Sequence, residues 1–201
     1  MSGRVSDERP DQPEVPAHIV EAARHVMASD GLAAATLERI SAAAGVSRMT
    51  LHRRGLSKAD IVGAIGRQLE RDYREAMWPA LVSKGTGQER LRRAIEALCA
   101  VTEDNRATLG TLSPATREQI YHDPGPARLT RKVFVEPLER LLLDGAADGS
   151  LAPRDPDETA TLLFNAVCHT YAHLRVEHRW AAARARQGVV DLVMNGVASG
   201  A

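Results

Sequence analysis

The sequence predicts an all-α protein in which a small N-terminal three-helix domain, containing a helix-turn-helix, precedes a larger helical domain. Apolar residues recur every three or four positions along most of the chain, which is the spacing of amphipathic helices. No stretch of useful length alternates apolar and polar residues as a strand would, and glycines and prolines interrupt the helical pattern. We therefore expect a disordered arm over residues 1–15, the small domain over residues 16–65 and the larger domain over residues 66–201.

The composition is that of an ordinary soluble protein. Of the 201 residues, 44% are hydrophobic and 26% are charged. No apolar run approaches the roughly 18 residues that a membrane helix needs, and the N-terminal segment lacks the apolar stretch of a signal peptide. We therefore expect a cytoplasmic protein. Cys99 and Cys168 are far apart in the sequence, which predicts free thiols rather than a disulfide framework or a set of zinc ligands.

The chain begins with a polar arm and a first helix. Pro10, Pro13 and Pro16 punctuate the arm, whose composition cannot bury enough apolar surface to fold by itself. Apolar residues then recur at helical spacing from residue 16 to about residue 29. Gly31 provides a stop signal for this helix.

Two short helices follow, and their capping residues define them. Thr36 caps the first, which ends at Gly45, where a positive φ angle is expected. Ser47 caps the second, Leu51 is its inward anchor and Gly55 closes it. Two helices joined by such a turn form a helix-turn-helix, a motif that reads DNA when the second helix exposes a basic face.

A basic strip covers this second helix and the turn after it. Arg48, Arg53, Arg54 and Lys58 lie between residues 47 and 58 with no acidic residue among them, although 26 basic and 26 acidic residues give the whole chain a net charge of zero. As a charge pattern alone, the strip is equally well explained as a solvated helix face. The helix-turn-helix around it favours contact with DNA phosphates.

The remainder of the chain is predicted to be helical as well. A fourth helix, capped by Ser57, extends to about Val82 and connects the two domains. Helices are expected over residues 89–103, near 109–112, around a kink at Pro137, from 155–157 to about 179, and over 189–197. The sequence HDPGP at residues 122–126 breaks the pattern, and residues 145–149 end the helix that contains Pro137.

The run TLERISAAAGVSRMTLHRRGLSKADIVGAI resembles the signature of the TetR family of transcription regulators. The matching residues are Thr36, Ile40, Ala44, Gly45, Val46, Ser47, Thr50 and Lys58. Ser41, His52 and Gly55 stand where the family usually has Ala, Tyr and Phe, and Leu56 is expected to fill the space of the missing Phe. The resemblance spans residues 19 to 65. It implies a transcription regulator, in the first instance a repressor, that binds a palindromic operator as a homodimer and is released by a small-molecule effector.

The resemblance and the basic strip together predict the residues that contact double-stranded DNA. They are Thr36, Ser47, Arg48, Met49, Thr50, His52, Arg53, Arg54 and Lys58. Residues of the second short helix are expected in or beside the major groove. Lys58, at the start of the next helix, is expected to act on a phosphate.

The last two helices are implied to hold two copies together, because in the family the final pair packs against its mate as a four-helix bundle. The apolar residues available for this contact are Leu162, Leu163, Ala166, Val167, Leu174, Val190, Leu192, Val193 and Val197. Some of them must instead belong to the core of one chain. A symmetric dimer would present two reading helices one DNA turn apart.

The helical domain is longer than dimerisation requires, which suggests a cavity for an effector. The predicted ligand-binding residues are Trp78, Leu98, Val101, Leu112, Phe134, Leu138, Phe164, Cys168 and Tyr171. Because only 3% of the residues are aromatic, an aliphatic or small amphipathic effector is favoured over a flat stacked one. Core packing would account for the same residues.

Two other classes of function stay open, namely a ligand-independent architectural DNA-binding protein and a small helical enzyme. A packed core without a cavity would favour the first. His169 and His173 share a helix face as zinc-binding histidines do, but Thr170 stands where a metalloprotease helix needs Glu, and no third or fourth ligand is evident. Packing in a dimer helix or pocket wall is the favoured explanation of these histidines. We expect no catalytic residues, no metal, no cofactor and no membrane partner.

Overall fold

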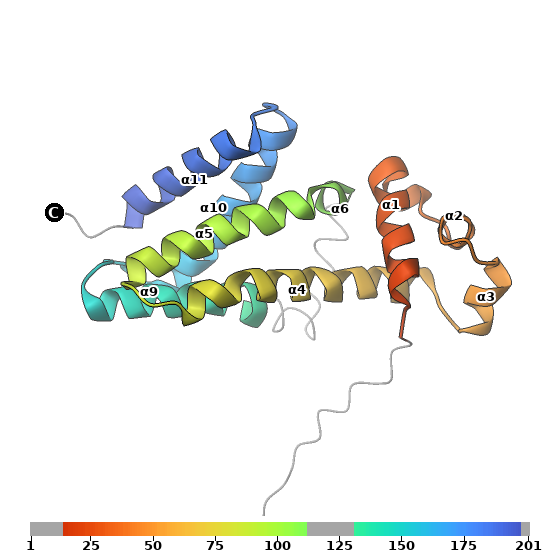
Figure 1. The fold of residues 1–201 in the computed structure, drawn as a ribbon, viewed down its shortest axis with the longest axis horizontal. Coiled ribbons are helices and arrows are strands. Elements are labelled where there is room, and N and C mark those ends of the chain that lie inside the picture. Colours follow the sequence, from red (N-terminus) through yellow and green to blue (C-terminus); the bar gives the residue numbers. More distant parts are fainter. Residues whose placement is uncertain (1–13, 112–130, 198–201) are drawn as a thin grey trace, which may run out of the picture. The chain divides into compact units, whose positions relative to one another are not determined.

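The computed structural model describes residues 14–111 and 131–197 of the chain. Its regular elements over these two ranges are all helices, and none of these helices is long and apolar enough to cross a membrane. The chain divides into two compact units, Met1–Gln68 and Leu69–Ala201. The division falls inside helix α4 (Lys58–Val82), which contributes residues to both units (Figure 1). The all-α prediction is confirmed.

The first helix of the N-terminal unit is longer than the sequence pattern indicated. Helix α1 spans Ala17–Ala34 instead of ending near residue 29. Gly31 has a φ angle of 82°, so the backbone leaves the helical region at this residue and one more turn follows it. The predicted stop at Gly31 is therefore a kink, and the extra turn brings the chain to Ala35, which is buried.

The helix-turn-helix has the predicted caps. Helix α2 spans Leu37–Ala43, and the Thr36 hydroxyl accepts a hydrogen bond from the Arg39 backbone N–H at 3.3 Å. Helix α3 spans Arg48–Arg53, and the Ser47 hydroxyl accepts one from the Thr50 backbone N–H at 3.1 Å. Gly45 ends the first of these helices with a φ angle of 66°, which an L side chain rarely adopts.

A small core holds the N-terminal unit together. Helix α1 packs against α2, and α2 packs against α3 (Figure 1). Leu51 of α3 is fully buried, as its role of inward anchor requires, and Leu56 is buried as expected of a replacement for the family's Phe. The buried apolar side chains of this unit include Ile19, Ala23, Val26, Met27, Ile40, Ile61 and Ile65.

The C-terminal unit is built around helix α5 (Gly87–Asp104), which the described elements surround. Helix α5 packs against α9 (Glu136–Asp148), α10 (Pro156–Val176) and α11 (Ala182–Val197), and α10 also packs against α9 and α11 (Figure 1). The short helix α6 (Arg106–Thr111) continues the chain after Asn105. Helices α5, α10 and α11 lie where helices were predicted, although α11 begins seven residues earlier than residue 189.

Two glycines allow α5 and α9 to approach closely. A Cβ atom added to Gly87 would lie 2.2 Å from the Gly145 backbone, so no larger residue fits at this crossing without movement of one helix. Beside it, the Gly87 N–H donates to Asp148 Oδ2 at 2.6 Å and the Gln88 N–H donates to the Ser150 hydroxyl at 3.0 Å. The end of α9 therefore helps to satisfy the free N–H groups at the start of α5.

The predicted kink near Pro137 takes the form of a change of helix type. A π-helical turn, Arg131–Val135, leads directly into α9, and Pro137 stands in the first turn of α9, where its missing N–H costs little. Gly149 ends α9 with a left-handed φ angle of 76°. The predicted break over residues 122–126 lies outside the described residues, and so do residues 1–13 of the arm expected over residues 1–15.

Three aromatic rings meet in the core of the C-terminal unit. The ring centroids of Tyr73 and Phe134 are 4.7 Å apart, and those of Phe134 and Phe164 are 5.4 Å apart. The Tyr73 hydroxyl, although buried, donates to the Phe134 carbonyl at 2.8 Å. Burial raises the pKa of Tyr73 far above its ordinary value, so this phenol stays protonated and acts as a structural donor.

Candidate nucleic-acid interface and effector region

Helix α3 presents nearly all of its polar side chains to solvent while one apolar residue anchors it. Arg48, His52 and Arg53 are exposed, and Met49 is 70% exposed although it is apolar. Thr50 is half-buried, and its hydroxyl lies 2.9 Å from the Ser47 hydroxyl at the N-cap. With Leu51 pointing inward, a short, rigidly capped helix displays a basic surface.

Arg48 stands at the first position of α3, where the helix dipole disfavours a cation. The first turn of α3 contains no acidic residue, and the basic residues His52 and Arg53 lie in the last turn. A positive charge at a helix N-terminus opposes the partial positive charge of the free N–H groups there. The charge of Arg48 therefore does not stabilise the helix. A residue that breaks a local stability rule in this way is expected at a functional site, here one that contacts an anion.

Lys58 and Thr36 have intramolecular roles in addition to the predicted contact with DNA. Lys58 Nζ donates to the Leu32 carbonyl at 2.7 Å, in the last turn of α1. A cation near a helix C-terminus is stabilising, so Lys58 helps to hold α1 against the start of α4. One of its three N–H donors is used in this bond. Thr36 is exposed and serves as the N-cap of α2, and Arg54 is exposed just after α3.

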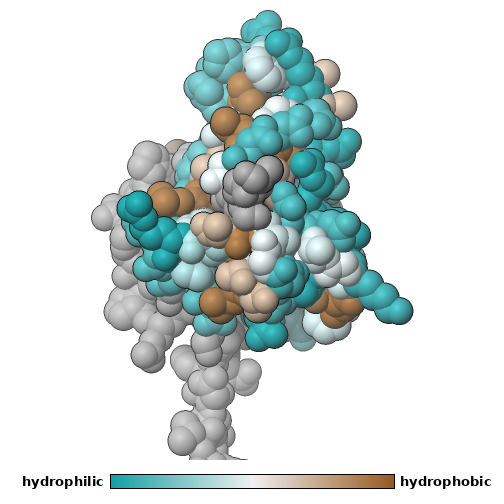
Figure 2. All heavy atoms as spheres, turned by 90° about the vertical axis from the view of Figure 1, so that its left-hand side faces the viewer, coloured by the Kyte–Doolittle hydropathy of each residue, from teal (hydrophilic) through white to brown (hydrophobic). Residues whose placement is uncertain are grey.

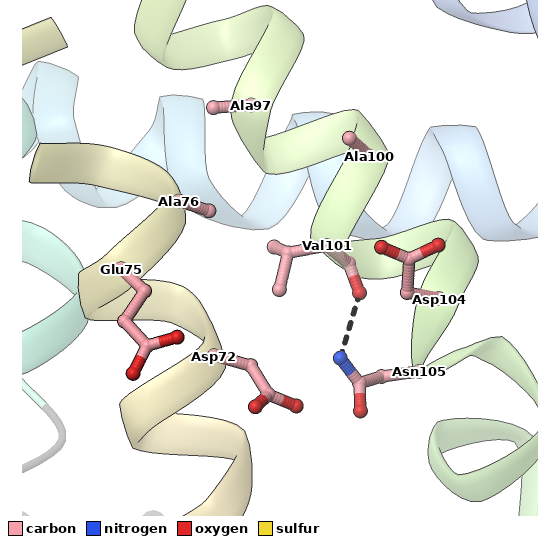
Figure 3. Close-up of a pocket in the computed structure, with 8 residues that line it drawn as sticks. All are labelled: Asp72, Glu75, Ala76, Ala97, Ala100, Val101, Asp104 and Asn105. Atoms are coloured by element: carbon pink, nitrogen blue, oxygen red, sulfur yellow. Dashed lines mark hydrogen bonds between the residues drawn. The ribbon is translucent and has the colours of Figure 1, made fainter. Parts of the chain in front are cut away.

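An open hollow of about 450 Å³ lies between α4 and α5 within the C-terminal unit (Figure 3). Small apolar side chains form part of its wall, namely Ala76 from α4 and Ala97, Ala100 and Val101 from α5. Three carboxylates also line it: Asp72 and Glu75 from α4 and Asp104 from α5. Asn105, which is buried, also lines the hollow, and its Nδ2 donates to the Val101 carbonyl at 3.0 Å.

Residues 19–65 match the family model described as bacterial regulatory proteins, tetR family. The match covers α1 to α3, the turn between α2 and α3, and the first part of α4. Residues 19–65 thus carry the helix-turn-helix DNA-binding domain of the TetR family. No curated protein matches the sequence.

Solved structures extend the similarity in fold to the C-terminal unit. A bacterial regulatory protein of the tetR family from Rhodococcus RHA1 is 20% identical, with 92% of this chain and 97% of that one covered and a TM-score of 0.73. The fatty acid degradation regulator FadR from Bacillus halodurans is 17% identical, with 89% and 97% covered and a TM-score of 0.72. A protein from Saccharomonospora viridis in complex with choline is 20% identical, with 91% and 97% covered and a TM-score of 0.69. At these identities the likeness concerns the fold, which is therefore TetR-like over both units.

The nine residues predicted to bind an effector lie in different environments. Leu98, Leu138, Phe164 and Tyr171 are buried in the core, and Phe134 and Cys168 pack against that core. Val101 lines the hollow of Figure 3. Trp78 is 63% exposed, and Leu112 lies outside the described residues. The structure thus brings most of the set together as packed core, and their role in ligand binding stays a prediction.

Sequence reasoning missed the acidic lining of the hollow. Asp72 and Glu75 stand three residues apart on one helix, and Asp104 and Asn105 are adjacent at the end of another. Each pair reads as an ordinary solvated helix surface when the sequence is considered alone. Only the packing of α4 beside α5 makes the two pairs face one space, and no local signal in the sequence specifies that packing.

A hydrogen-bonded ion pair links the ends of α5 and α10. The Glu103 carboxylate accepts from Arg175 Nη2 at 2.8 Å, from Arg175 Nε at 2.9 Å and from the Tyr171 hydroxyl at 3.1 Å. Another N–H of Arg175 donates to the Trp180 carbonyl, which anchors the connection between α10 and α11. Hydrogen bonds from Arg175 are the largest cause that lowers the pKa of Glu103 below its ordinary value.

The two cysteines are unreactive thiols in this arrangement. Burial raises the pKa of Cys99 to about 12 and that of Cys168 to about 11. Both therefore stay protonated near neutral pH, and thiolate chemistry is suppressed. The Thr102 hydroxyl lies 3.7 Å from Cys168 Sγ, so Cys168 contacts polar as well as apolar neighbours.

Helix α10 carries an exposed and uncharged stripe on the side opposite its buried residues. We call Leu162, Ala166, His169, His173 and Val176 the outer stripe; their spacing alternates between four and three residues, which keeps them on one helix face. Leu162 is 61% exposed. Arg175 is the only Asp, Glu, Lys or Arg from residue 159 to residue 176, and it is bound to Glu103. A helix so poor in charge on every side is typical of one that is buried.

Proposed function

We propose that this TetR-family regulator binds a palindromic operator as a homodimer through α3 and is released from it by a small organic effector, which makes it a repressor. The observation that carries the proposal is the capped, basic and exposed α3 on a buried Leu51 anchor. Two such helices in a two-fold symmetric dimer would enter successive major grooves about 34–36 Å apart. The protein would act in the cytoplasm, where the chromosome is accessible to it.

The outer stripe supports dimerisation through α10. Leu162 and Val176 would remain in water in a single chain, and Leu192 of α11 is 72% exposed. The stripe has no formal charge, so two copies can approach without like-charge repulsion. In a two-fold contact the same surface must be complementary to itself, and an uncharged apolar stripe meets that condition. A second copy is therefore the occupant that we assign to this face.

Apolar side chains are scattered on the side of the molecule that Figure 2 shows. Brown hydrophobic areas lie there among teal hydrophilic ones. Isolated apolar groups of this kind are usual at the surface of a monomeric protein. The regular spacing of the outer stripe along one helix face distinguishes it from such isolated groups and favours α10 for the dimer contact.

The dimer is tested by placing a charge in the outer stripe. Leu162→Asp would put an unpaired carboxylate into the contact, which costs several kcal/mol and should shift the protein to monomer. Sedimentation of the wild type and the variant at micromolar concentration measures this shift. Val82→Asp, at an exposed apolar position in α4, is the matched control and should leave the assembly unchanged. A monomeric wild type that binds operator as a monomer would refute the dimer.

The hollow between α4 and α5 supports an amphipathic effector that is cationic or neutral. Its small apolar wall suits an aliphatic group, while three carboxylates would repel a negatively charged head group. The similar protein from Saccharomonospora viridis was solved in complex with choline, which is a cation, whereas the similar protein from Bacillus halodurans is a fatty acid degradation regulator. A thermal-shift screen with choline, other organic amines, neutral lipids and fatty acids distinguishes these classes, and displacement of operator DNA by a hit tests the sensor function.

The alternative function is that of a ligand-independent architectural DNA-binding protein. The packing of Leu98, Leu138, Phe164 and Tyr171 into one core favours this alternative. Two results together would favour the architectural protein. No compound in the screen would change operator affinity, and the protein would bind many unrelated DNA sequences with equal affinity.

A further inference from the structure

Two imidazoles occupy the centre of the outer stripe of α10. His169 and His173 are separated by one helical turn, and both are exposed in the single chain. Residues at this spacing have Cβ atoms about 5–6 Å apart, which lets two imidazole rings bind the same metal ion. Polar side chains at the middle of an otherwise apolar contact surface need partners once water is removed.

Two arginines in this part of the chain are engaged in other contacts. The Arg175 guanidinium is bound to Glu103, and the Arg184 guanidinium lies 3.9 Å above the Trp180 ring. The His178 ring contacts the His173 ring edge-on, with centroids 5.1 Å apart. A third imidazole therefore stands next to the histidine pair.

A single chain does not complete a metal site. Over residues 14–111 and 131–197, no group of three or more His, Cys, Asp or Glu side chains is arranged to hold a metal ion. His169 and His173 can supply two nitrogen ligands, and zinc in proteins takes four ligands in a tetrahedron. The described residues of one chain therefore leave two of the four ligand positions to be filled.

The position of the pair within the outer stripe indicates where those ligands are. His169 is the third of the five stripe residues, with Leu162 and Val176 at the ends. In a two-fold contact between antiparallel helices, an axis that passes close to the middle of the stripe, between His169 and His173, brings these two side chains of both copies together. We propose that the dimer binds one divalent transition metal ion on this axis through His169 and His173 of both chains. The inference rests on the proposed dimer.

The ligand chemistry defines the class of metal. Four neutral imidazoles suit Zn²⁺, and they also suit Ni²⁺, Cu²⁺ and Co²⁺, whereas Mg²⁺ and Ca²⁺ prefer oxygen ligands. Only deprotonated imidazole nitrogens bind the ion, so acid competes with the metal. Binding would draw the two copies of α10 together and lower the dimer dissociation constant.

Metal titration of the full-length protein tests the proposal. After dialysis against EDTA, calorimetry with Zn²⁺ should give one ion per two chains, and Co²⁺ should produce the visible absorption of a tetrahedral complex. His169→Gln and His173→Gln should each weaken Zn²⁺ binding about tenfold or more. Loss of a residue that only hydrogen-bonds to a metal ligand already weakens binding by about that factor. His25→Gln, at an exposed histidine of α1, is the matched control and should bind as the wild type does.

Sedimentation with EDTA and with Zn²⁺ separates this inference from the proposed dimer. Zn²⁺ should tighten the wild-type dimer and leave the dimer of each Gln variant unchanged. A metal-free dimer that binds no Zn²⁺, or binds it equally well in both Gln variants, overturns the metal site and leaves the dimer standing. One ion bound per monomeric chain overturns the bridging geometry. A wild type that is monomeric with and without Zn²⁺ overturns the dimer itself.

Discussion

At the scale of single residues, Arg48 offers the sharpest test of DNA contact. Its side chain is exposed at the start of α3, so Arg48→Ala should change the unfolding free energy by no more than about 0.5 kcal/mol, or stabilise slightly by removing a cation from a helix N-terminus. If Arg48 reads a base, the same change should weaken specific operator binding by about 1–3 kcal/mol. Competition binding with operator and scrambled DNA measures this. Equal operator affinity in a folded variant would remove Arg48 from the interface.

Lys58 should behave differently, because its side chain has one partner within the chain, the Leu32 carbonyl, and one predicted partner on DNA, a phosphate. Its Nζ donates to the Leu32 carbonyl, so Lys58→Ala should lower the unfolding free energy by no more than about 3 kcal/mol, the upper range for a hydrogen bond to a charged group. Loss of a phosphate contact should reduce the slope of log binding constant against log salt concentration by about 1, and by the same amount for every DNA sequence. The exposed Arg54→Ala is the control, since it should change the slope without the loss of stability. An unchanged slope for Lys58→Ala would leave Lys58 with a structural role alone.

At the scale of elements, the crossing of α5 and α9 depends on the absence of a side chain at Gly87. Gly87→Ala would place a Cβ atom 2.2 Å from the Gly145 backbone, which should cost about 1–3 kcal/mol through overpacking. Gly66→Ala, inside α4, meets nothing within 4 Å and should be neutral or stabilising by about 0.5–1 kcal/mol. Urea unfolding of both variants tests the pair. Equal stability of the two would mean that the crossing is looser than described.

The ion pair between α5 and α10 should make stability depend on acid. The pKa of Glu103 is lowered in the folded chain, so its contribution is fully present above its ordinary pKa of about 4.5 and is lost as the pH falls through the lower, folded-state value. Glu103→Gln should therefore destabilise the protein at neutral pH, and the difference from the wild type should shrink below pH 4.5. The exposed Glu96→Gln is the control on the same helix. A difference that is constant from pH 7 to acid would argue against a charge effect.

The elements also show which parts of the fold are encoded locally. The caps at Thr36 and Ser47 and the end of α2 at Gly45 were predictable, because a side chain and its own backbone decide them. The extension of α1 beyond Gly31 was not predictable, since burial of Ala35 against other elements outweighs a local stop signal. Tyr73 was likewise missed as the centre of the aromatic core, because its partners lie about 60 to 90 residues further along the chain.

The same distinction applies to the candidate sites. The exposed basic face of α3 follows from one short segment of sequence, and it lies where it was predicted. The hollow depends on which faces of α4 and α5 meet. Among the described residues of the predicted effector set, Val101 alone lines it. The spacing of the outer stripe of α10 is evident in the sequence. Its exposure is known only from the structure, in which the opposite face of α10, with Phe164 and Val167, lies in the core.

At the scale of the whole molecule, the proposed switch requires that DNA and effector compete without touching. Helix α4 belongs to both units, carrying Lys58 at its start and Asp72, Glu75 and Ala76 at the hollow further along. A change in the position of this helix would thus be felt at both sites. Linkage demands reciprocity, so the factor by which an effector lowers operator affinity must equal the factor by which operator lowers effector affinity.

Two substitutions distinguish a sensing hollow from a sensing core. Ala100→Trp places a ring in the open hollow from an exposed position, so it should block the effector while leaving melting temperature and operator affinity near those of the wild type. Cys168→Trp forces the same ring against packed neighbours, beside the Thr102 hydroxyl, and should cost about 1–3 kcal/mol of stability. Both are assayed by melting temperature, operator affinity and response to the thermal-shift hit. If Cys168→Trp keeps full stability and abolishes the response while Ala100→Trp responds normally, the effector binds in a cavity inside the core and the hollow is not its site.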